Sequence, residues 1–186
     1  VNVQRAGPST GLPTKVEQSD LLQAIHGRHG ECPMPVIAAR SPADGFDCAL
    51  EAFRIAVKYM TPVILLSDGG IANAAEPWRI PTVSDLHGPE VRFHTTTADF
   101  APYARNAELA RPWVRPGTPG LEHRIGGLEK DFLSGNISHV PANHQRMVET
   151  RAAKVDGVAR EIPPTRVDGA ADAALLMLTW GGTWGA

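Results

Sequence analysis

The feature that most constrains the fold is the alternation, over the first 70 residues, of short apolar runs with longer amphipathic segments. The runs VNV (1–3), PVIAA (35–39) and PVILL (62–66) are short and rich in β-branched residues, which favours buried strands over helices. Ser41 as N-cap and Pro42 at the first helical position predict that a helix fills the space between the last two runs. Strands that alternate with helices in this way are typical of a parallel sheet flanked by helices, an α/β fold.

We expect three helices in the chain. The first is predicted over residues 15–27, because Thr14 and Glu17 have the spacing of a capping box. The second is predicted over 41–60, and the third at about 141–161 before Pro163 and Pro164. The apolar residues expected to face the core are Val16, Leu21, Leu22 and Ile25 in the first helix, Phe46, Leu50, Phe53 and Val57 in the second, and Val148, Ala152, Val155, Ala159 and Ile162 in the third.

The periodicity fades after Gly69 and Gly70, from about Ala72, and this divides the chain into three predicted parts. Residues 1–76 form the α/β unit, and residues 77–165 form a long connecting segment that contains the third helix and ten of the sixteen prolines. Aromatic residues are expected to attach this segment to a surface; they are Trp78, Phe93, Phe100, Tyr103 and Trp113. Residues 166–186 contain AALLMLTWGG (173–182), which predicts a buried strand that opens another domain. Because a strand needs partners, we interpret the chain as an internal piece of a longer protein.

Composition excludes several classes of function. With 18 basic and 20 acidic residues the net charge is −2, so no overall field attracts nucleic acid or an anionic membrane. No apolar run reaches the roughly 18 residues of a membrane span, and we predict no membrane partner. The two cysteines, Cys32 and Cys48, form neither a disulfide framework nor a metal-binding spacing, so we expect no metal in this chain and a reducing, cytoplasmic location.

The loop RAGPSTGLPT (5–14) carries the most suggestive chemistry, because it follows a predicted strand and precedes a predicted helix. Arg5 offers a planar fork of donors that suits a carboxylate, and Ser9, Thr10 and Thr14 add hydroxyl groups. A helix N-terminus would add free N–H groups and a positive dipole. Loops at the carboxyl ends of parallel strands commonly bind ligands, so we predict an anion site here. A plain turn with a surface salt bridge remains the alternative.

The loop SDGG (67–70) lies at the end of another predicted strand, where Asp68 could ligate a metal or orient a polar substrate. An ordinary turn is again the alternative. The chain contains no G-x-S-x-G nucleophile motif and no glycine-rich nucleotide fingerprint with an acidic partner. From its residues alone, the chain is predicted to be an α/β anion-binding unit without a complete catalytic set.

Four long motifs carry a family resemblance that covers nearly the whole chain in order. They are RAGPSTGLPTKVEQSDLLQAIHGRHGECPMPVIAA, EAFRIAVKYMTPVILLSDGGIANAAEPWRIP, GLEHRIGGLEKDFLSGNISHVPANHQRMV and LTWGGTWGA. The chain resembles the α subunit of thiamine-diphosphate-dependent 2-oxoacid:ferredoxin oxidoreductases. The resemblance implies a pyrimidine-binding-type domain, the connecting segment, and the start of a transketolase C-terminal-like domain.

The resemblance also implies residue roles. Arg5 would clamp the C1 carboxylate of the substrate and Thr14 would lie at its distal end, with Gly7, Pro8 and Gly11 shaping the loop. The glutamate that activates the cofactor and the family's Y-P-I-T-P stretch are absent from this sequence. Gly70 stands where the family is expected to have a bulky residue, and NAAEPW replaces the usual NGSEPW. No catalytic residue is therefore expected within this chain.

The implied activity is oxidative decarboxylation of a 2-oxoacid to acyl-coenzyme A, with electrons passed to ferredoxin. The 2-oxoglutarate type is favoured on GRHGECPMPVIAARSPAD (27–44), and pyruvate or a branched-chain 2-oxoacid is the alternative. The implied cofactors are thiamine diphosphate and Mg²⁺ shared with a β subunit, and a 4Fe–4S cluster in that partner. A different class of function, a non-catalytic module that holds subunits together, also stays open.

Overall fold

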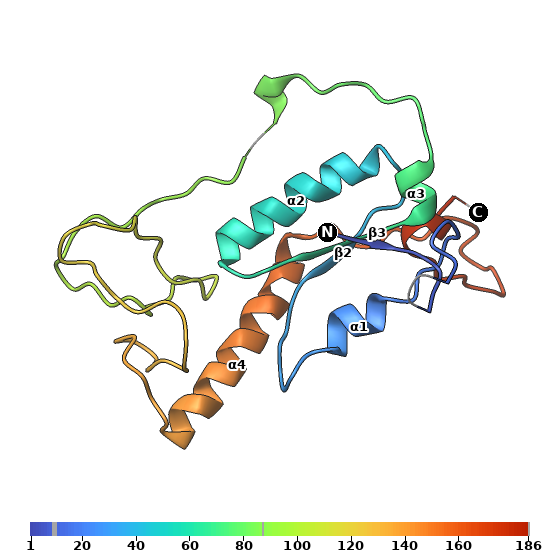
Figure 1. The fold of residues 1–186 in the computed structure, drawn as a ribbon. Coiled ribbons are helices and arrows are strands. Elements are labelled where there is room, and N and C mark those ends of the chain that lie inside the picture. The colour runs from blue at the N-terminus through green and yellow to red at the C-terminus, as the bar shows by residue number, and fades with distance from the viewer. Residues whose placement is uncertain (9–10, 87, 186) are drawn as a thin grey trace.

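A parallel sheet of three strands lies at the centre of the chain, whose computed structural model describes residues 1–8, 11–86 and 88–185 (Figure 1). The strand order is β1-β3-β2, so β3, which begins with the apolar residues Ile64, Leu65 and Leu66, occupies the middle, and Leu66 is completely buried. The strands are β1 (Asn2–Gln4), β2 (Val36–Ala38) and β3 (Ile64–Asp68). The parallel α/β fold predicted from the three apolar runs is confirmed.

The second predicted helix is confirmed as α2 (Asp44–Tyr59), but its buried face differs from the prediction. Ile55 and Tyr59, one turn apart, are the buried residues, and they pack with Val158. Phe53 is 58% exposed, so its predicted core position is wrong. Two residues span about 200° of a helix, and Phe53 therefore lies opposite to Ile55.

The first predicted helix is wrong over residues 15–20, because α1 is only Leu21–His26. The carbonyl of Lys15 accepts the N–H of Ala6 at 3.0 Å, and the N–H of Lys15 donates to the Leu12 carbonyl at 3.0 Å. These backbone groups are used within the loop and cannot start a helix. The predicted buried face is also wrong, since Val16, Leu22 and Ile25 are exposed and Ala24 is the buried residue of α1.

The third predicted helix is confirmed as α4 (Pro141–Val158), which continues into the 3-10 helix η2 (Ala159–Glu161). Its buried residues are Met147, Gly157 and Val158. The expected face was therefore misplaced: Ala152, Ala159 and Ile162 are exposed, and Val148 and Val155 are half-buried. The face that packs is set by where α4 meets α2, which apolar spacing within α4 does not reveal.

Glu161 fixes the end of α4 to α2. Its carboxylate accepts hydrogen bonds from Tyr59 Oη at 2.5 Å, Lys58 Nζ at 2.6 Å and Arg54 Nη1 at 2.7 Å. Burial alone would raise the pKa of Glu161, but these donors outweigh it and lower the pKa to about 2. The contact joins residues about 100 positions apart in the sequence and closes the core formed by Ile55, Tyr59 and Val158.

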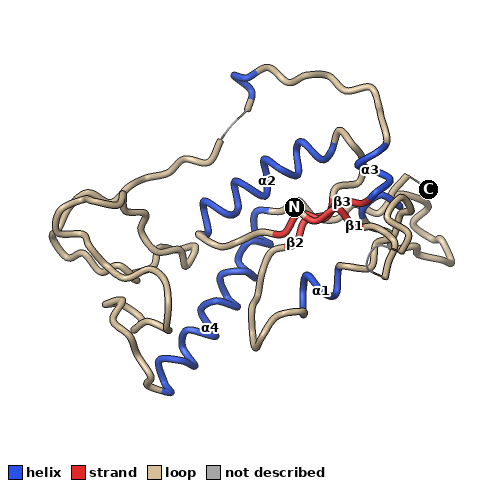
Figure 2. Tube along the Cα trace, in the orientation of Figure 1, coloured by secondary structure: helices blue, strands red, loops and turns tan. Residues whose placement is uncertain are grey.

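The connecting segment between α3 (Gly69–Asn73) and α4 is mostly irregular and runs around the outside of α2 (Figure 2). Its short 3-10 helix η1 covers Val83–Asp85. Trp78 packs against Phe46 of α2 with ring centroids 5.2 Å apart, and Trp113 Nε1 donates to the carbonyl of Val57 at 3.0 Å. The predicted attachment of this segment by aromatic residues is thus confirmed at both tryptophans.

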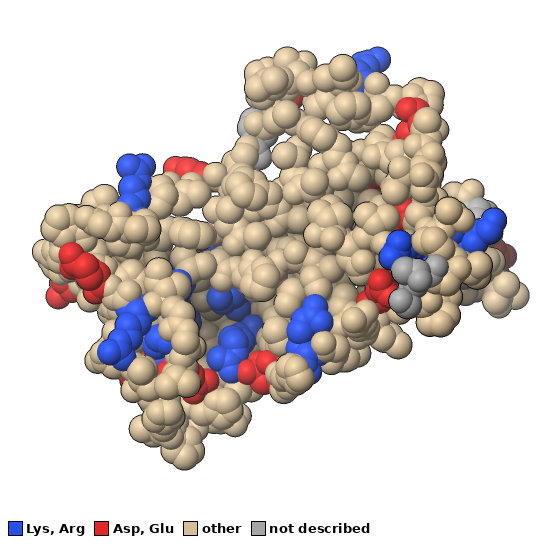
Figure 3. All heavy atoms as spheres, viewed as in Figure 1, with Lys and Arg blue, Asp and Glu red and all other residues tan. Residues whose placement is uncertain are grey.

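Basic side chains gather where the connecting segment meets α4 (Figure 3). Arg105 Nη1 donates to the carbonyls of Tyr103 at 2.9 Å and Phe132 at 3.0 Å, and the Arg146 guanidinium lies 3.4 Å from the Phe132 ring centroid. Burial and the neighbouring arginines lower the pKa of Lys154 to about 8. Carbonyls and the Phe132 ring thus hold Arg105 and Arg146, and Arg105 forms no ion pair within the described part of the chain.

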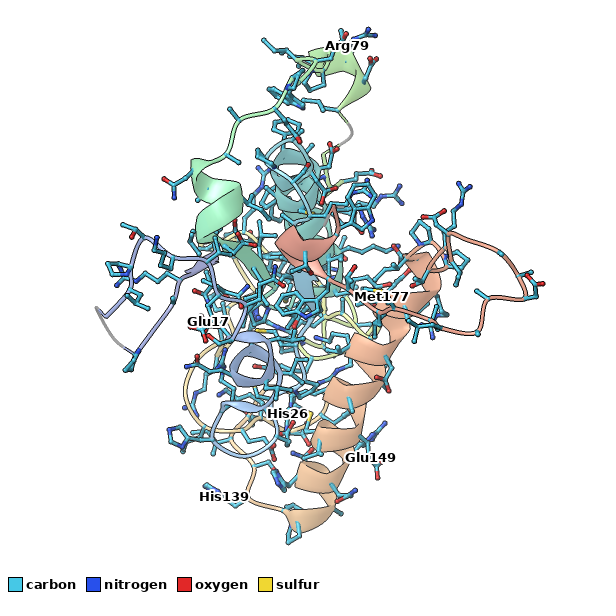
Figure 4. The ribbon with its side chains drawn as sticks, turned by 90° about the vertical axis from the view of Figure 1, so that its right-hand side faces the viewer. Glu17, His26, Arg79, His139, Glu149 and Met177 are labelled. Carbon is cyan, nitrogen blue, oxygen red and sulfur yellow. The ribbon has the colours of Figure 1, made fainter. Side chains whose placement is uncertain are left out.

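The predicted strand over 173–182 is wrong: this segment is irregular up to the 3-10 helix η3 (Gly181–Thr183). Residues 175–178 are 74–90% exposed, and Figure 4 shows Met177 on a loop that stands away from the body of the chain. No strand in the described residues lies beside them, so the backbone has no ladder to join. The predicted domain boundaries at 76/77 and 165/166 stay predictions. No helix in the described part is long and apolar enough to cross a membrane.

Candidate functional site

The carboxyl ends of β1 and β3 lie side by side, because the two strands are parallel neighbours with Gln4 opposite Asp68. Arg5 follows β1 directly, and Asp68 is the last residue of β3. The loop that follows β1 (residues 5–18, called the opening loop below), α3 and the C-terminal residues gather at this edge of the sheet (Figure 1). The structure therefore brings together the two loops that the sequence singled out, at the edge where ligands of such sheets bind.

The opening loop is closed at its base. Ala6 and Leu12 form an antiparallel bridge, and the N–H of Ala6 donates to the Lys15 carbonyl at 3.0 Å. Arg5 precedes Ala6 and Thr14 precedes Lys15, so this hydrogen bond places the two predicted substrate residues at the same end of the loop. Both Arg5 and Thr14 are exposed, and Arg5 forms no ion pair within the described residues.

Gly11 sits where a side chain would crowd the loop backbone. A Cβ at this position would lie 3.0 Å from the Pro8 carbonyl oxygen and 3.4 Å from that of Gly7. The N–H of Gly11 donates to the same Pro8 carbonyl at 2.9 Å, which explains the close approach. The loop-shaping roles predicted for Gly7, Pro8 and Gly11 agree with this geometry, whereas Ser9 and Thr10 lie outside the described residues.

Glu17 and the helix dipole do not act as the sequence suggested. Glu17 Oε2 accepts the N–H of Gly7 at 3.0 Å, so it holds the loop rather than capping a helix with Thr14 (Figure 4). Because α1 begins only at Leu21, no helix N-terminus follows Thr14. The positive charge at this end of the loop comes from the side chains of Arg5 and Lys15.

Asp68 is only 2% exposed, and its carboxylate is used within the fold. Oδ1 accepts the N–H groups of Gly70 at 2.8 Å and Ile71 at 3.0 Å, which caps α3. Oδ2 accepts Gln18 Nε2 at 3.3 Å. The described residues contain no group of three or more His, Cys, Asp and Glu side chains that could hold a metal ion. Asp68 therefore caps α3 and bridges to Gln18. This agrees with the structural interpretation of the SDGG loop and not with a metal ligand.

Gly69 and Gly70 let the two loops pack together. A Cβ at Gly70 would lie 3.1 Å from Val16 Cγ2, and one at Gly69 would lie 3.6 Å from the Lys15 carbonyl oxygen. A bulky side chain at position 70, expected from the family pattern, would meet Val16. The departure at Gly70 thus has a local packing reason.

The contacts of Gln4 and Gln18 at this edge were not predicted from the sequence. Gln4 is 2% exposed; its Nε2 donates to the Ser67 carbonyl at 3.1 Å, and its Oε1 accepts the N–H of Asp20 at 3.0 Å. A glutamine at the end of an apolar strand was the available signal, because a buried amide needs partners on both sides. Gln18, which bridges to Asp68, had no such signal.

The WGG residues of the C-terminal segment close the same edge. A Cβ at Gly182 would overlap Asp68 Oδ2 and lie 3.1 Å from its Cγ. Gly181 has φ of +61°, a left-handed conformation that glycine adopts without strain. Arg40, which follows β2, places its guanidinium 4.7 Å from the Trp184 ring centroid. The end of β3 and the residues just after β2 therefore meet the C-terminal segment.

A cavity of about 670 Å³ lies elsewhere, between α2 and the connecting segment. It is lined by cations such as Arg105 and Arg111, and also by Asp99, Glu90 and Glu108. Its four cations, Lys58, Arg92, Arg105 and Arg111, outnumber these carboxylates, but the cavity lies away from the carboxyl edge of the sheet. Because ligands of such sheets bind at that edge, the sheet edge with Arg5 is the better candidate for substrate binding.

A parallel α/β unit with an arginine-bearing loop at the carboxyl edge of its sheet defines an α/β ligand-binding domain of the doubly wound type. More specifically, residues 1–136 match the family model described as pyruvate flavodoxin/ferredoxin oxidoreductase, thiamine diP-bdg, and the chain belongs to this family. The family resemblance inferred from the sequence motifs is confirmed.

The similar proteins are subunits of 2-oxoacid oxidoreductases. The chain is 58% identical over its whole length to "2-oxoglutarate oxidoreductase subunit KorA" of Mycobacterium tuberculosis, of which it covers 28%. It is 33% identical over 96% of its length to "2-oxoacid:ferredoxin oxidoreductase 1, subunit alpha" of Aeropyrum pernix, of which it also covers 28%. The chain thus spans less than a third of the length of these curated relatives.

A solved structure supports the same fold. It is a 2-oxoglutarate:ferredoxin oxidoreductase from Magnetococcus marinus with 2-oxoglutarate, coenzyme A and succinyl-CoA bound. The match has a TM-score of 0.77 and 36% sequence identity, and it covers 91% of this chain and 30% of that one.

Proposed function

We propose that this chain is the substrate-carboxylate-binding part of an α subunit in a 2-oxoglutarate:ferredoxin oxidoreductase. The complete enzyme would convert a 2-oxoacid and coenzyme A into CO₂ and an acyl-CoA, and it would pass two electrons to ferredoxin. The observation that carries the proposal is the position of Arg5. It is an exposed guanidinium without an ion pair among the described residues, at the joint carboxyl edge of β1 and β3.

Arg5 fits the C1 carboxylate of a 2-oxoacid because a guanidinium donates two parallel hydrogen bonds to a carboxylate. Holding that carboxylate in one orientation favours loss of CO₂, which needs a fixed alignment of the breaking bond. Thr14 lies at the same end of the loop and would donate its hydroxyl to the far end of the substrate. Thr10 and Ser9 are proposed as further donors from the loop, with Asp68 supporting it from the second loop.

Thiamine diphosphate, when bound, supplies the nucleophilic carbon and the electron sink for decarboxylation. The described residues fit the substrate side of such a site better than its metal side. Mg²⁺ needs free oxygen ligands, whereas the Asp68 carboxylate is occupied by three donors and covered by Gly182. We therefore assign Mg²⁺, the diphosphate and a 4Fe–4S cluster to a β subunit, and the family description supports the cofactor itself.

The 2-oxoglutarate type is favoured over pyruvate and branched-chain types by the 58% identity to a 2-oxoglutarate oxidoreductase subunit. The solved relative with 2-oxoglutarate and coenzyme A bound supports the same choice. The relatives' description as α subunits supports partner subunits for the complete protein. The two free cysteines, Cys32 and Cys48, agree with a reducing, cytoplasmic location.

The test is Arg5→Ala in the complete enzyme, assembled with its partner subunit and assayed by ferredoxin reduction. We expect kcat/KM for 2-oxoglutarate to fall by roughly 10²-fold or more, mainly through KM, because a charged contact is lost. Arg5→Lys keeps the charge but not the fork, and should recover only part of the loss. Arg79→Ala, a remote arginine (Figure 4), is the matched control and should change neither constant.

The wild-type assay with 2-oxoglutarate, pyruvate and a branched-chain 2-oxoacid decides among the substrates. A preference for pyruvate would replace the substrate and keep the reaction type. Unchanged kinetics in Arg5→Ala would remove Arg5 from the site, and a wild-type complex inactive on all three acids would favour the non-catalytic subunit-interaction module.

A further inference from the structure

We propose that Asp68, Gln18 and Gly182 form a tether that positions the substrate loop, so that Asp68 acts as a positioning residue for Arg5 and Thr14. The inference rests on the proposed function of that loop. It starts from the burial of Asp68, which is 2% exposed and forms no ion pair with a cation in the described residues. A buried carboxylate is costly unless several donors hold it, so its contacts show what it serves.

The two oxygens of the Asp68 carboxylate bind different elements, α3 and the opening loop. Oδ1 accepts the N–H groups of Gly70 and Ile71 at 2.8 and 3.0 Å, which fixes the start of α3. Oδ2 points to the opening loop, where Gln18 Nε2 donates to it at 3.3 Å. A side chain that only capped α3 would not need this second contact, so Asp68 joins α3 to the loop that carries Arg5.

Gln18 lies two residues before Asp20, which is joined to β1: its N–H donates to Gln4 Oε1 at 3.0 Å, and its Oδ2 accepts Asn2 Nδ2 at 2.9 Å. Within the loop, Ala6 bonds to the Lys15 carbonyl at 3.0 Å and Gly7 bonds to Glu17 at 3.0 Å. These bonds set the shape of the loop and hold it beside β1, but none of them attaches residues 15–18 to β3. The bond from Gln18 to Asp68 makes that attachment, and it ties the Thr14 side of the loop to β3.

Gly182 of the C-terminal segment packs against the Asp68 carboxylate. A Cβ at this residue would overlap Asp68 Oδ2, and a Cβ at Gly181 would lie 3.2–3.3 Å from the amide atoms of Gln18. The glycine pair therefore lies against both members of the bond between Asp68 and Gln18. Removing the Gln18 amide, which donates to Asp68, or adding a methyl group at position 182 should release the loop by the same route.

The experiment uses the complete enzyme with its partner subunit, and it measures KM for 2-oxoglutarate and kcat separately. Gln18→Ala and Gly182→Ala should each raise KM roughly 10-fold with kcat changed less than about twofold, because a charge-assisted bond that orders the loop is lost. Gln23→Ala is the control for the first variant, since Gln23 is exposed on α1. Gly185→Ala is the control for the second, because a Cβ at Gly185 meets nothing within 4 Å.

Asp68→Asn separates positioning from a chemical role of the charge. Its carbonyl oxygen can still accept from Gly70 and Ile71, and its amide can donate to Gln18 once the Gln18 amide rotates. A positioning residue predicts a KM close to wild type in Asp68→Asn. A large loss of kcat in Asp68→Asn, with Gln18→Ala unchanged, would overturn the proposal.

A second readout does not depend on activity. Amide hydrogen exchange over residues 6–18 should be faster in Gln18→Ala and Gly182→Ala than in their control variants, while exchange in α2 stays the same. Equal exchange and equal KM in variants and controls would refute the tether. A wild-type complex without 2-oxoacid activity would instead refute the proposed function, and the exchange measurement would still decide the tether.

Discussion

Glu161→Gln offers a direct test of how α2 and α4 are held together. The wild-type carboxylate accepts bonds from Tyr59, Lys58 and Arg54 at 2.5–2.7 Å, and an amide keeps the shape but loses the charge. Glu161 and Arg54 have 26% and 28% side-chain exposure, so solvent screening reduces the gain from each pair. We expect a loss of about 1–2 kcal/mol in the local opening free energy of this contact.

The assay is amide hydrogen exchange at η2 and the end of α4 in the complete subunit. A loss of about 1–2 kcal/mol predicts roughly 5- to 30-fold faster exchange, since 1.36 kcal/mol corresponds to tenfold. Glu149→Gln is the matched control, because Glu149 is an exposed glutamate on the same helix whose carboxylate, within the described residues, accepts a bond from Gln145 at 2.7 Å and forms no ion pair. It should leave exchange at η2 unchanged.

The stabilisation that the Glu161 carboxylate provides should depend on pH in a direction set by its lowered pKa. The pKa of Glu161 is lowered from 4.5 to about 2, so its contribution is fully present above pH 4.5. It is lost as the pH falls towards about 2, because the unfolded carboxyl group binds its proton first. The gap between wild type and Glu161→Gln should therefore shrink below pH 4.5. A gap that persists unchanged at pH 2.5, or no gap at pH 7, would refute the charge-based explanation.

Two further predictions concern the connecting segment and α2. Trp113→Phe removes the indole hydrogen bond to the Val57 carbonyl. Amide exchange should then be faster at His94, whose N–H donates to the Trp113 carbonyl at 2.8 Å. Trp78→Phe is the control and should not change this exchange, because Trp78 packs on α2 through its ring. Burial and the nearby Asp44 carboxylate raise the pKa of the Cys48 thiol to about 12, so Cys48 stays protonated at pH 8. Alkylation by iodoacetamide, followed by peptide mass spectrometry, should be roughly 10²- to 10³-fold slower at Cys48 than at an unstructured cysteine, and faster in Asp44→Asn; an ordinary rate at Cys48 would contradict this.

The strands and the two long helices could be predicted from the sequence because their signals are local. PVILL and PVIAA are continuous apolar runs, and the Ser41-Pro42 signal predicts the helix between them. The predicted start is wrong by two residues, because α2 begins at Asp44 with Ala43 as its N-cap. The faces of α2 and α4 could not be predicted in the same way. Ile55, Tyr59 and Val158 are buried because two helices distant in sequence meet there, and several apolar stripes on each helix satisfy the same spacing.

The two failed secondary-structure predictions depend on where the backbone hydrogen bonds go. Residues 15–20 have helix-like spacing, but Ala6 and Leu12 bind the backbone of Lys15 first. Residues 173–182 have strand-like composition, but no strand among the described residues pairs with them. At the site, Arg5 was found by its local motif, whereas Gln18 and Gly182 matter only through Asp68, about 50 and 114 positions away.

Because the connecting segment is attached to α2, residues can be inserted or deleted in its exposed part without moving the attached parts. The segment leaves from α3 and returns through α4, and Glu161 and Trp113 anchor its far part directly to α2. Residues added or deleted around Ile80 and Val83, which are 79% and 82% exposed, would lengthen or shorten an excursion without moving either anchor. Closing a longer excursion costs little extra entropy. Insertions there are thus insulated from the sheet edge, and this stretch can diverge while the arginine loop keeps its geometry.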